Sequence, residues 1–383
     1  MKFNKFNFSH YFIFPIMMLN FLISIFFTNL TKKRNKSVLL LGHKLTGNVE
    51  VIFNECQADF NLSYMTLNLK DYLKLKNIYG NKILFSLNLF HVYKAFKSKI
   101  IISSHGIFFH NLLQKKFTKT IYCGHSIFGS IPQNKDKIIK FFKLYEEVWL
   151  HSPYEKKIFI NELGCEIGNL KVIGYPRNKM LLDSKSNKEI LKSKNLISGK
   201  KIILYAPTAN RGNKNYINSE FSISNRDFYE FISQELGPNT VLIIKNHLND
   251  NIPSEIKNMT IGNSNIYFSN DLQLKYDYDS LIMSDLLITD FSTIYVDYLL
   301  LEKPIYFLNN PDPDPERELS SIFKNKNLPR INNKEELINL FFEVESGMIN
   351  SNVSKKLKKE VYEEFDHSKI IDNIEEIFKD ALR

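Results

Sequence analysis

The chain has 383 residues, of which 44% are apolar and 24% are charged. At about 150 residues per domain, this length predicts two sizeable globular domains. Glycine (14) and proline (12) are sparse, which excludes collagen-like, linker-rich and low-complexity proteins. The cysteines, Cys56, Cys123 and Cys165, lie far apart without a C-x-x-C pair. This spacing indicates neither a zinc site nor a disulfide framework, and it favours a reducing, cytosolic environment.

The net charge of +10 is concentrated in the first third of the chain. Residues 1–120 hold 17 Lys and Arg against 4 Asp and Glu, whereas residues 121–383 hold 34 against 37. A basic region beside a nearly neutral one predicts that one domain faces an anionic partner. Nucleic acid is one candidate for that partner, and anionic lipid or a polyanionic acceptor is the other.

The N-terminal run Tyr11–Phe27 contains no charged residue over 17 positions, which is near the short limit for spanning a hydrocarbon core of about 30 Å. Basic residues flank the run, with Lys2 and Lys5 before it and Lys32, Lys33, Arg34 and Lys36 after it. The positive-inside bias would leave the body of the protein in the cytoplasm. We therefore expect residues 1–36 to form a membrane anchor or interfacial helix with a basic flank. A cleaved signal peptide and an ordinary core helix are the alternatives.

Short apolar runs then alternate with segments of helical spacing, which predicts parallel sheets covered by helices. The first series of strands is expected at residues 37–43, 82–86, 99–102, 120–123 and 148–151, and the second at 201–205, 241–245, 265–268, 286–289 and 304–308. A polar stretch, 183–200, separates the two series. We therefore expect an α/β protein with Rossmann-like domains at 37–182 and 183–352. The apolar spacing of residues 353–383 predicts a long or broken helix packed on the body.

The common dinucleotide, P-loop, zincin and hydrolase signatures are absent from the sequence. Polar residues instead follow several predicted strands, at the sheet edge where open α/β sheets bind ligands. The first cluster is Gly124-His125-Ser126, in which the histidine could act as a base near neutral pH. A simple turn without a functional role is the alternative.

Two further clusters carry cationic and hydroxyl groups. Thr208 follows the strand at 201–205 and could hydrogen-bond an anion, with Arg211 adding positive charge. Lys245 and His247 leave the next strand two residues apart, so both could meet one phosphate. An ordinary strand-to-loop transition and a solvated strand end are the alternatives.

The fourth cluster lies within Ser284–Asp297, where a buried strand ends at Asp290 and Ser292 and Thr293 open a helix. Serine and threonine at a helix start are expected to cap it. The free N–H groups and the dipole of such a helix also favour a bound phosphate.

Taken in order, these clusters resemble the CDP-glycerol glycerophosphotransferase family of teichoic-acid and capsule synthesis. The family's W-H-G-T-P motif corresponds to Gly124-His125-Ser126, its R-x-H-P motif to the segment 245–248, and its D-Y-S-S motif to the segment 290–293. A-P-T matches directly at residues 206–208. Further matches are Ser152-Pro153-Tyr154, the segment 174–178 that contains Arg177, and Lys303-Pro304. A hydrophobic N-terminus leading into the first strand is similar to that of the primase-type members.

The resemblance implies a GT-B-like fold, two Rossmann-like domains facing a cleft, with the C-terminal domain holding a CDP-alditol. It implies catalytic roles for His125, as general base, and for His247, near the donor phosphates. It also implies substrate-binding roles for the remaining polar residues of the clusters: Gly124, Ser126, Arg177, Thr208, Arg211, Lys245, Asp290, Ser292, Thr293 and Asp297.

The expected activity is transfer of glycerol phosphate or ribitol phosphate from a CDP-alditol to a hydroxyl of a membrane-linked acceptor, with release of CMP. We expect this activity at the cytoplasmic face of the cell membrane, against an anionic lipid surface. No cofactor or metal is expected, because no carboxylate pair or His/Cys cluster suggests a metal cage. No nucleic-acid partner is expected either, because no basic, aromatic-rich RNA module is visible. The alternatives are a GT-B glycosyltransferase using a nucleotide sugar and a membrane-tethered polyanion binder without catalysis.

Overall fold

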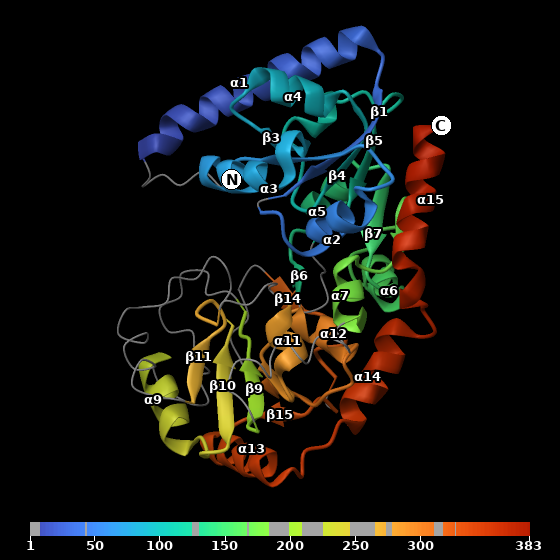
Figure 1. The fold of residues 1–383 in the computed structure, drawn as a ribbon. Coiled ribbons are helices and arrows are strands. Elements are labelled where there is room, and N and C mark those ends of the chain that lie inside the picture. The colour runs from blue at the N-terminus through green and yellow to red at the C-terminus, as the bar shows by residue number, and fades with distance from the viewer. Residues whose placement is uncertain are drawn as a thin grey trace.

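Two α/β lobes, each built on a parallel sheet, make up the computed structural model of the chain (Figure 1). The structure describes residues 8–42, 44–124, 130–166, 168–183, 199–208, 225–245, 265–272, 278–309, 317–325 and 327–383. The expectation of an α/β protein with two Rossmann-like sheets is confirmed.

The N-terminal lobe contains a seven-stranded sheet of order β3-β2-β1-β4-β5-β7-β8, with every pairing parallel. Its strands are β1 (Asn35–Leu41), β2 (Leu62–Thr66), β3 (Ile83–Phe85), β4 (Ser98–Ser103), β5 (Lys119–Tyr122), β7 (Glu147–Leu150) and β8 (Leu170–Val172). Its helices are α2 (Gly47–Cys56), α3 (Leu69–Tyr79), α4 (Leu89–Phe96), α5 (Lys135–Phe142), α6 (Pro153–Asn161) and α7 (Arg177–Asp183). The five strands predicted in this half are confirmed, while β2 and β8 are additions.

The C-terminal lobe contains a six-stranded parallel sheet of order β11-β10-β9-β12-β13-β15. Its strands are β9 (Lys201–Tyr205), β10 (Thr240–Ile244), β11 (Ile266–Phe268), β12 (Leu286–Thr289), β13 (Ile305–Leu308) and β15 (Arg330–Ile331). Its helices are α9 (Asn225–Glu235), α11 (Asp279–Met283), α12 (Ile294–Leu299) and α13 (Lys334–Ser346). All five strands predicted here are confirmed. The strand order reverses between β9 and β12, and such a switch point is where open α/β sheets bind ligands.

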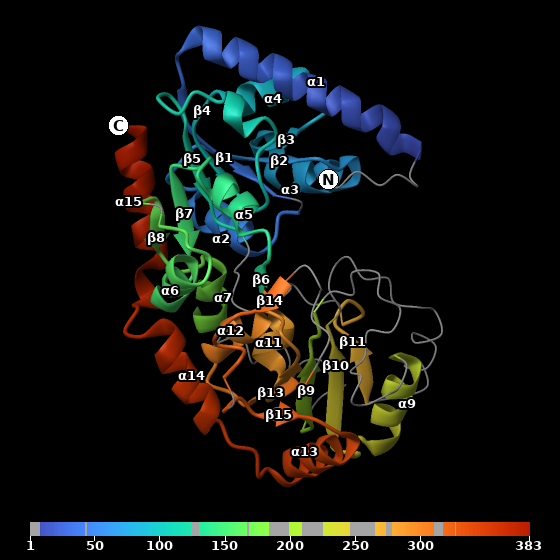
Figure 2. The same ribbon diagram turned by 180° about the vertical axis from the view of Figure 1, so that it is seen from behind.

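Besides the connecting chain, a strand pair and the C-terminal helices join the two lobes (Figure 1). A short antiparallel ladder pairs β6 (Ser130–Pro132) of the first lobe with β14 (Arg317–Leu319) of the second. The C-terminal helices, α14 (Asn352–Tyr362) and α15 (Ile370–Leu382), run beside both lobes (Figures 1 and 2). The predicted C-terminal helix is therefore broken, and the break begins at Glu363, where φ is +51°.

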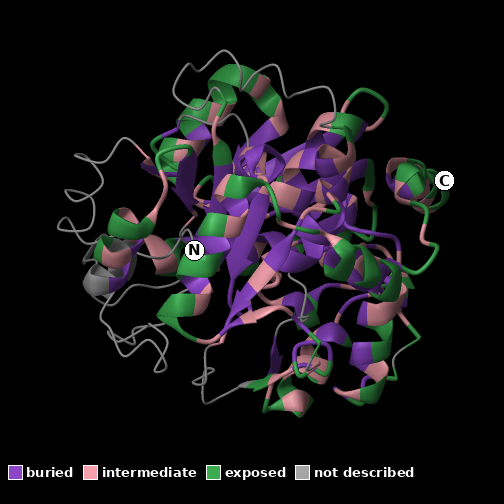
Figure 3. Cartoon of the chain, turned by 90° about the horizontal axis from the view of Figure 1, so that it is seen from below, coloured by how far each residue is buried: buried purple, intermediate pink, exposed green. Residues whose placement is uncertain are grey.

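Helix α15 completes the core of the N-terminal lobe. Its residues Ile370, Ile374 and Phe378 are fully buried in the same apolar cluster as β1, β2, β4 and α2. Full burial of a side chain of this size stabilises the fold by about 1.5–3 kcal/mol. As Figure 3 shows, burial is concentrated on the strands, and the helices keep one outward face exposed.

Helix α1 (Phe8–Thr31) packs along α4 and carries apolar residues on both its inner and its outer side. Its polar residues Asn20, Ser24 and Thr28 lie on the buried face, four positions apart. Met17, Phe21 and Ile25 are buried on the same side of the helix, in an apolar cluster with β1, β2 and α4. The outer side exposes six large apolar residues, with 38–61% of each accessible: Ile16, Leu19, Leu22, Phe26, Phe27 and Leu30. The segment Ile13–Thr31 is long and apolar enough to cross a membrane, although a third of its most apolar window is buried against the body.

Gly174 marks a tight contact between β8 and the C-terminal helices. Its φ is +80°, and a Cβ placed there would lie 2.8 Å from side-chain atoms of Phe365 and Ile370. Gly164 has a similar φ of +67°, but a Cβ placed there would have no atom within 4 Å. The two glycines therefore share a backbone constraint but differ in steric surroundings.

Replacing Gly174 with Ala should lower the free energy of unfolding by about 2–5 kcal/mol, because a strained backbone is combined with overpacking. Gly164→Ala is the matched control and should cost only the backbone term, about 1–2 kcal/mol. Urea denaturation of both variants measures the difference. Equal losses in the two variants would contradict the close packing of α15 on Gly174.

Candidate active site

The carboxyl ends of β9 and β12 meet at the switch point of the C-terminal sheet, and a buried carboxylate ties them together. Asp290, directly after β12, accepts hydrogen bonds from the Thr208 backbone N–H (3.0 Å) and hydroxyl (2.6 Å). It also accepts one from the Ser292 backbone N–H at 3.0 Å. Asp290 therefore holds the loop after β9 against the loop after β12.

Burial raises the pKa of Asp290, and the hydrogen bonds from Thr208 and Ser292 oppose that rise. Only 4% of the residue is exposed. Because its oxygens point at the two loops, Asp290 positions Thr208 and Ser292. These two half-buried residues form the part of the cluster that a ligand can reach.

The expectation that Ser292 and Thr293 cap a helix is wrong. Helix α12 begins at Ile294, and its N-cap residue Thr293 makes no side-chain capping hydrogen bond. The helix has only six residues, so its first turn is also most of its length. Since capping does not account for the two hydroxyls, they stay candidates for contact with a ligand.

In the N-terminal lobe, Gly124 follows β5 in a space that admits no side chain. A Cβ at this position would lie 2.3 Å from the Ser104 carbonyl oxygen and 2.3 Å from the ring of Tyr122. Glycine is therefore required for the chain to leave the sheet here. His125 and Ser126, which follow it, lie outside the described residues.

Arg177 and Asp297, both predicted to bind substrate, pair with each other across the lobes. The Arg177 Nε lies 3.2 Å from Asp297 Oδ1, and the Arg177 Nη2 lies 3.0 Å from Asp297 Oδ2. Both side chains are nearly buried, with 12% and 4% exposed. Although burial opposes the charge of Arg177, Asp297 holds the guanidinium pKa above its usual value. Two-point pairing of this kind fixes orientation as well as distance.

His151 and Tyr362 extend this pair into a network that we call the interlobe joint: Arg177, Asp297, His151 and Tyr362. The Tyr362 hydroxyl, on α14, donates to the Val296 carbonyl oxygen at 2.9 Å. His151 Nε2 lies 2.6 Å from that hydroxyl and therefore donates to it. Burial, together with the charge of Arg177, holds the pKa of His151 well below its usual value, so the ring is neutral.

Asn48, a residue that sequence reasoning missed, connects the joint to the end of β5. Its Nδ2 donates to the Cys123 carbonyl oxygen at 2.7 Å, and its Oδ1 accepts from the Arg177 backbone N–H at 3.2 Å. Cys123 immediately precedes Gly124. Asn48 is 5% exposed, and a buried side-chain amide needs hydrogen-bond partners. In the sequence it stands between Gly47 and Val49 at the start of the apolar helix α2, which is a weak signal.

The remaining predicted residues are only partly covered by the structure. Lys245 follows β10, and its backbone N–H donates to the Tyr205 carbonyl oxygen at 2.8 Å, so the lysine starts beside the end of β9. Arg211 and His247 lie outside the described residues. Among the residues that the structure describes, no group of three or more His, Cys, Asp or Glu could hold a metal ion.

The interlobe joint predicts a large loss of stability when one partner is removed. Asp297→Asn should lower the free energy of unfolding by about 3–5 kcal/mol, because Arg177 stays buried without its counter-charge. The double variant Arg177→Met/Asp297→Leu should recover most of that loss. Chemical denaturation measures both. As a control, Lys379→Ala breaks an exposed ion pair with Glu375 and should cost at most about 0.5 kcal/mol. A double variant as unstable as Asp297→Asn would contradict this account of the pair.

The sequence of the chain is similar to those of several known enzymes of teichoic acid synthesis. The chain is 30% identical over 230 residues to the teichoic acid glycerol-phosphate primase of Bacillus subtilis, an alignment covering 56% of this chain and 57% of the relative. It is 36% identical over 140 residues to the teichoic acid poly(glycerol phosphate) polymerase of Bacillus spizizenii, covering 35% of this chain and 33% of the relative. It is 25% identical over 298 residues to that organism's teichoic acid poly(ribitol-phosphate) polymerase, covering 72% of this chain and 45% of the relative. The chain thus aligns with 33–57% of the length of each of these three relatives.

Solved structures with the same fold include the wall teichoic acid polymerase TagF, with a TM-score of 0.70 at 16% identity over 96% of this chain and 94% of that chain. A variant of the same polymerase soaked with CDPG aligns over 98% of both chains, also with a TM-score of 0.70. The Staphylococcus aureus MnaA–UDP structure aligns less closely, with a TM-score of 0.56 at 12% identity over 90% of this chain and 96% of that chain. At these identities the likeness shows the fold, and it confirms the expected GT-B-like arrangement.

The sequence model that describes CDP-Glycerol:Poly(glycerophosphate) glycerophosphotransferase matches residues 25–369, which include both sheets and every predicted site residue. The chain therefore belongs to the CDP-glycerol:poly(glycerophosphate) glycerophosphotransferase family.

Proposed function

We propose that this protein transfers an alditol phosphate, glycerol phosphate or ribitol phosphate, from its CDP derivative to a hydroxyl of a membrane-linked acceptor in cell-surface polymer synthesis. The match of the family model over residues 25–369 carries this proposal. The relatives include a glycerol-phosphate primase and polymerases of both glycerol phosphate and ribitol phosphate, which supports these two alditols as candidates for the donor. Asp290 accepts from the Thr208 N–H and hydroxyl and from the Ser292 N–H, which fixes the two loops at the sheet edge. We assign the Ser292 hydroxyl, carried by one of these loops, to the donor diphosphate.

In this reaction an acceptor oxygen attacks the β-phosphorus of the CDP-alditol. The bond from the β-phosphorus to the bridging oxygen breaks, and CMP leaves with that oxygen. His125 removes the acceptor proton, and Lys245, His247 and the hydroxyls of Ser292 and Thr293 stabilise the charge on CMP. Phosphoryl transfer depends mainly on positioning and charge stabilisation, so fixed cations and hydrogen-bond donors suit it.

The interlobe joint would align the two halves of this site. Arg177 contacts Asp297 of the second lobe through its side chain and Asn48 of the first lobe through its backbone. Asn48 in turn holds the strand end that leads to His125. The structure shows Arg177 and Asp297 paired with each other. Their predicted role in binding substrate stays a proposal.

Helix α1 supports a position on the cytoplasmic face of the membrane. The outer face of a helix in a soluble protein is normally polar, whereas α1 exposes six large apolar residues on its outer face in addition to the apolar residues that it buries. Such a helix fits the membrane interface, where the exposed side chains enter the acyl boundary. The basic residues 32–36 that follow it would then meet anionic headgroups.

A donor panel with purified full-length protein and a lipid-linked acceptor tests the proposed reaction. CMP release is expected from CDP-glycerol or CDP-ribitol, with no UDP release from UDP-sugars. His125→Ala should lower turnover at least about 100-fold, as expected for loss of a general base, with CDP-alditol binding retained. Ser292→Ala should raise the donor KM, and Ser346→Ala, an exposed serine on α13, is its control. UDP release alone would assign the protein to the nucleotide-sugar glycosyltransferases instead.

Vesicle sedimentation tests the placement of α1. Phe26→Ser combined with Leu30→Ser should weaken binding to anionic vesicles at least about tenfold, because apolar area leaves the bilayer. Ile78→Ser on α3 removes an equally exposed apolar residue and should leave binding unchanged. Added salt should release part of the bound wild-type protein, because headgroup attraction is screened. Equal binding by all three proteins would contradict an interfacial α1.

A further inference from the structure

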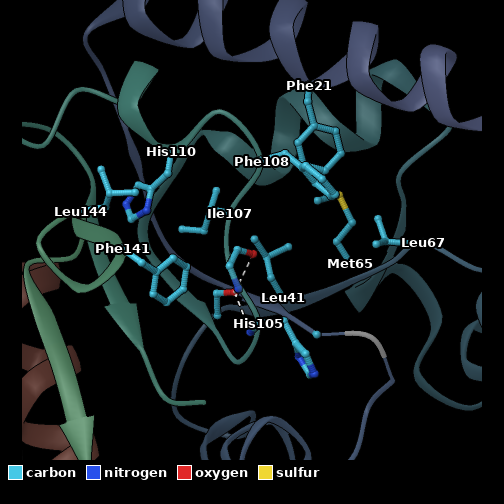
Figure 4. A pocket seen from close by; sticks show the side chains of 13 residues that line it. Phe21, Leu41, Met65, Leu67, His105, Ile107, Phe108, His110, Phe141 and Leu144 are labelled. Carbon is cyan, nitrogen blue, oxygen red and sulfur yellow. Dashed lines mark hydrogen bonds between the residues drawn. The ribbon is translucent and has the colours of Figure 1, made fainter. Parts of the chain in front are cut away.

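An apolar cavity of about 410 Å³ lies in the N-terminal lobe beneath α1 (Figure 4). This volume falls within the range of about 300–1,000 Å³ that is typical of small-molecule sites. The cavity lies at the carboxyl ends of β1, β2 and β4, which contribute Leu41, Met65 and Ser103. On the opposite side Phe21 of α1 reaches down beside Phe108, their ring centroids 5.8 Å apart.

The position of the cavity in the sheet favours a bound ligand. In the order β3-β2-β1-β4-β5-β7-β8, the connections run one way from β1 and the other way from β4. The cavity therefore occupies the switch point of the N-terminal lobe, as the Thr208–Asp290 contact occupies that of the C-terminal lobe. The neighbouring strand β5 leads to Gly124, so the cavity and the proposed acceptor site share one edge of the sheet.

The polar groups at the cavity are turned away from its interior or kept neutral. The Ser103 hydroxyl is engaged in the adjoining turn, donating to the Gly106 carbonyl oxygen and accepting from the Gly106 N–H, both at 2.9 Å. Burial, with a smaller contribution from Lys115, lowers the pKa of His110 to about 4, so this ring is uncharged at neutral pH. The interior therefore suits hydrocarbon.

The edge of the cavity is polar, with His105 among its lining residues and Lys44 close to it in the chain. His105, after β4, is exposed and lies 2.7 Å from the Ser104 hydroxyl through its Nδ1. Lys44, two residues beyond the cavity residue Gly42, is also exposed. A ligand with an apolar tail and an anionic head would match this arrangement.

We propose that this cavity holds the hydrocarbon nearest the head group of the lipid-linked acceptor, between the membrane-facing helix α1 and the site of transfer. This inference rests on the proposed function and deepens it. Helix α1 exposes apolar residues on its outer face and lines the cavity with Phe21 on its inner face, so one helix borders both the bilayer and the cavity. A chain bound there stays beside the membrane while its head group lies at the sheet edge that carries Gly124.

Acceptors that share one head group but carry hydrocarbon tails of increasing length test the proposal in the full-length protein. The acceptor KM should fall about fourfold for each methylene buried and then level off once the cavity is full. Leu67→Trp fills the cavity, because Leu67 lines it. This variant should lose most of the dependence on tail length but keep the wild-type kcat and KM with a tail-free soluble acceptor.

Leu69→Trp is the matched control, since Leu69 begins α3 two residues later and is 55% exposed outside the cavity. It should behave as wild type. Ile107→Trp is a second filling variant that keeps the test available if Leu67→Trp does not fold. An unchanged tail-length dependence in either folded filling variant would overturn the proposal.

A binding measurement without donor separates this proposal from the proposed reaction. Farnesyl phosphate should raise the Tm of wild type and Leu69→Trp by about 2–4 °C and leave the filling variants unchanged. An equal rise in all of them would place the apolar tail elsewhere and refute the cavity site. If the donor panel shows no CMP release while this pattern of Tm values holds, the proposed function fails and the apolar-tail site stands.

Discussion

The two-point ion pair between Arg177 and Asp297 is the interaction on which the relative placement of the lobes depends. A buried ion pair of this kind contributes little net stability, because removing two charges from water costs about as much as their attraction returns. Its effect is on geometry. Any other compact arrangement of the lobes that buries Arg177 away from Asp297 would leave a buried charge without compensation, so the pair disfavours such arrangements. The β6–β14 ladder and helix α14 also connect the two lobes. Together with the ion pair, they fix the orientation of one sheet relative to the other.

The two sheets follow the same rule but present different chemistry at their switch points. In the C-terminal lobe this place is polar, because Asp290 joins the loop that carries Thr208 to the loop that carries Ser292. In the N-terminal lobe the corresponding place is an apolar cavity bordered by α1. A transferase that joins a soluble, charged donor to a membrane-linked acceptor needs both kinds of surface. The difference between the switch points therefore agrees with the proposed function better than either surface would alone.

The fold could be predicted from the sequence to the extent that each strand carries its own signal. A continuous aliphatic run such as the one in β10 strongly favours a buried strand, whereas β2 contains Ser63 and Thr66 and was missed. Site residues next to strand ends were found for the same local reason. The interlobe joint was not, because its partners lie up to 211 positions apart and pair only after both lobes have formed. The direction of the Asp290 carboxylate, toward two loops, likewise depends on contacts that the sequence does not display.

Helix α15 has a consequence for the order in which the protein is made. Ile370, Ile374 and Phe378 fill the core of the lobe that the ribosome produces first. Domains generally fold as units during synthesis, beginning with the N-terminal one. Here the first lobe leaves the ribosome with an open apolar surface and cannot close it until the second lobe has been synthesised. Nascent chains of intermediate length should therefore depend on chaperones, and the native N-terminal lobe is a late product of translation.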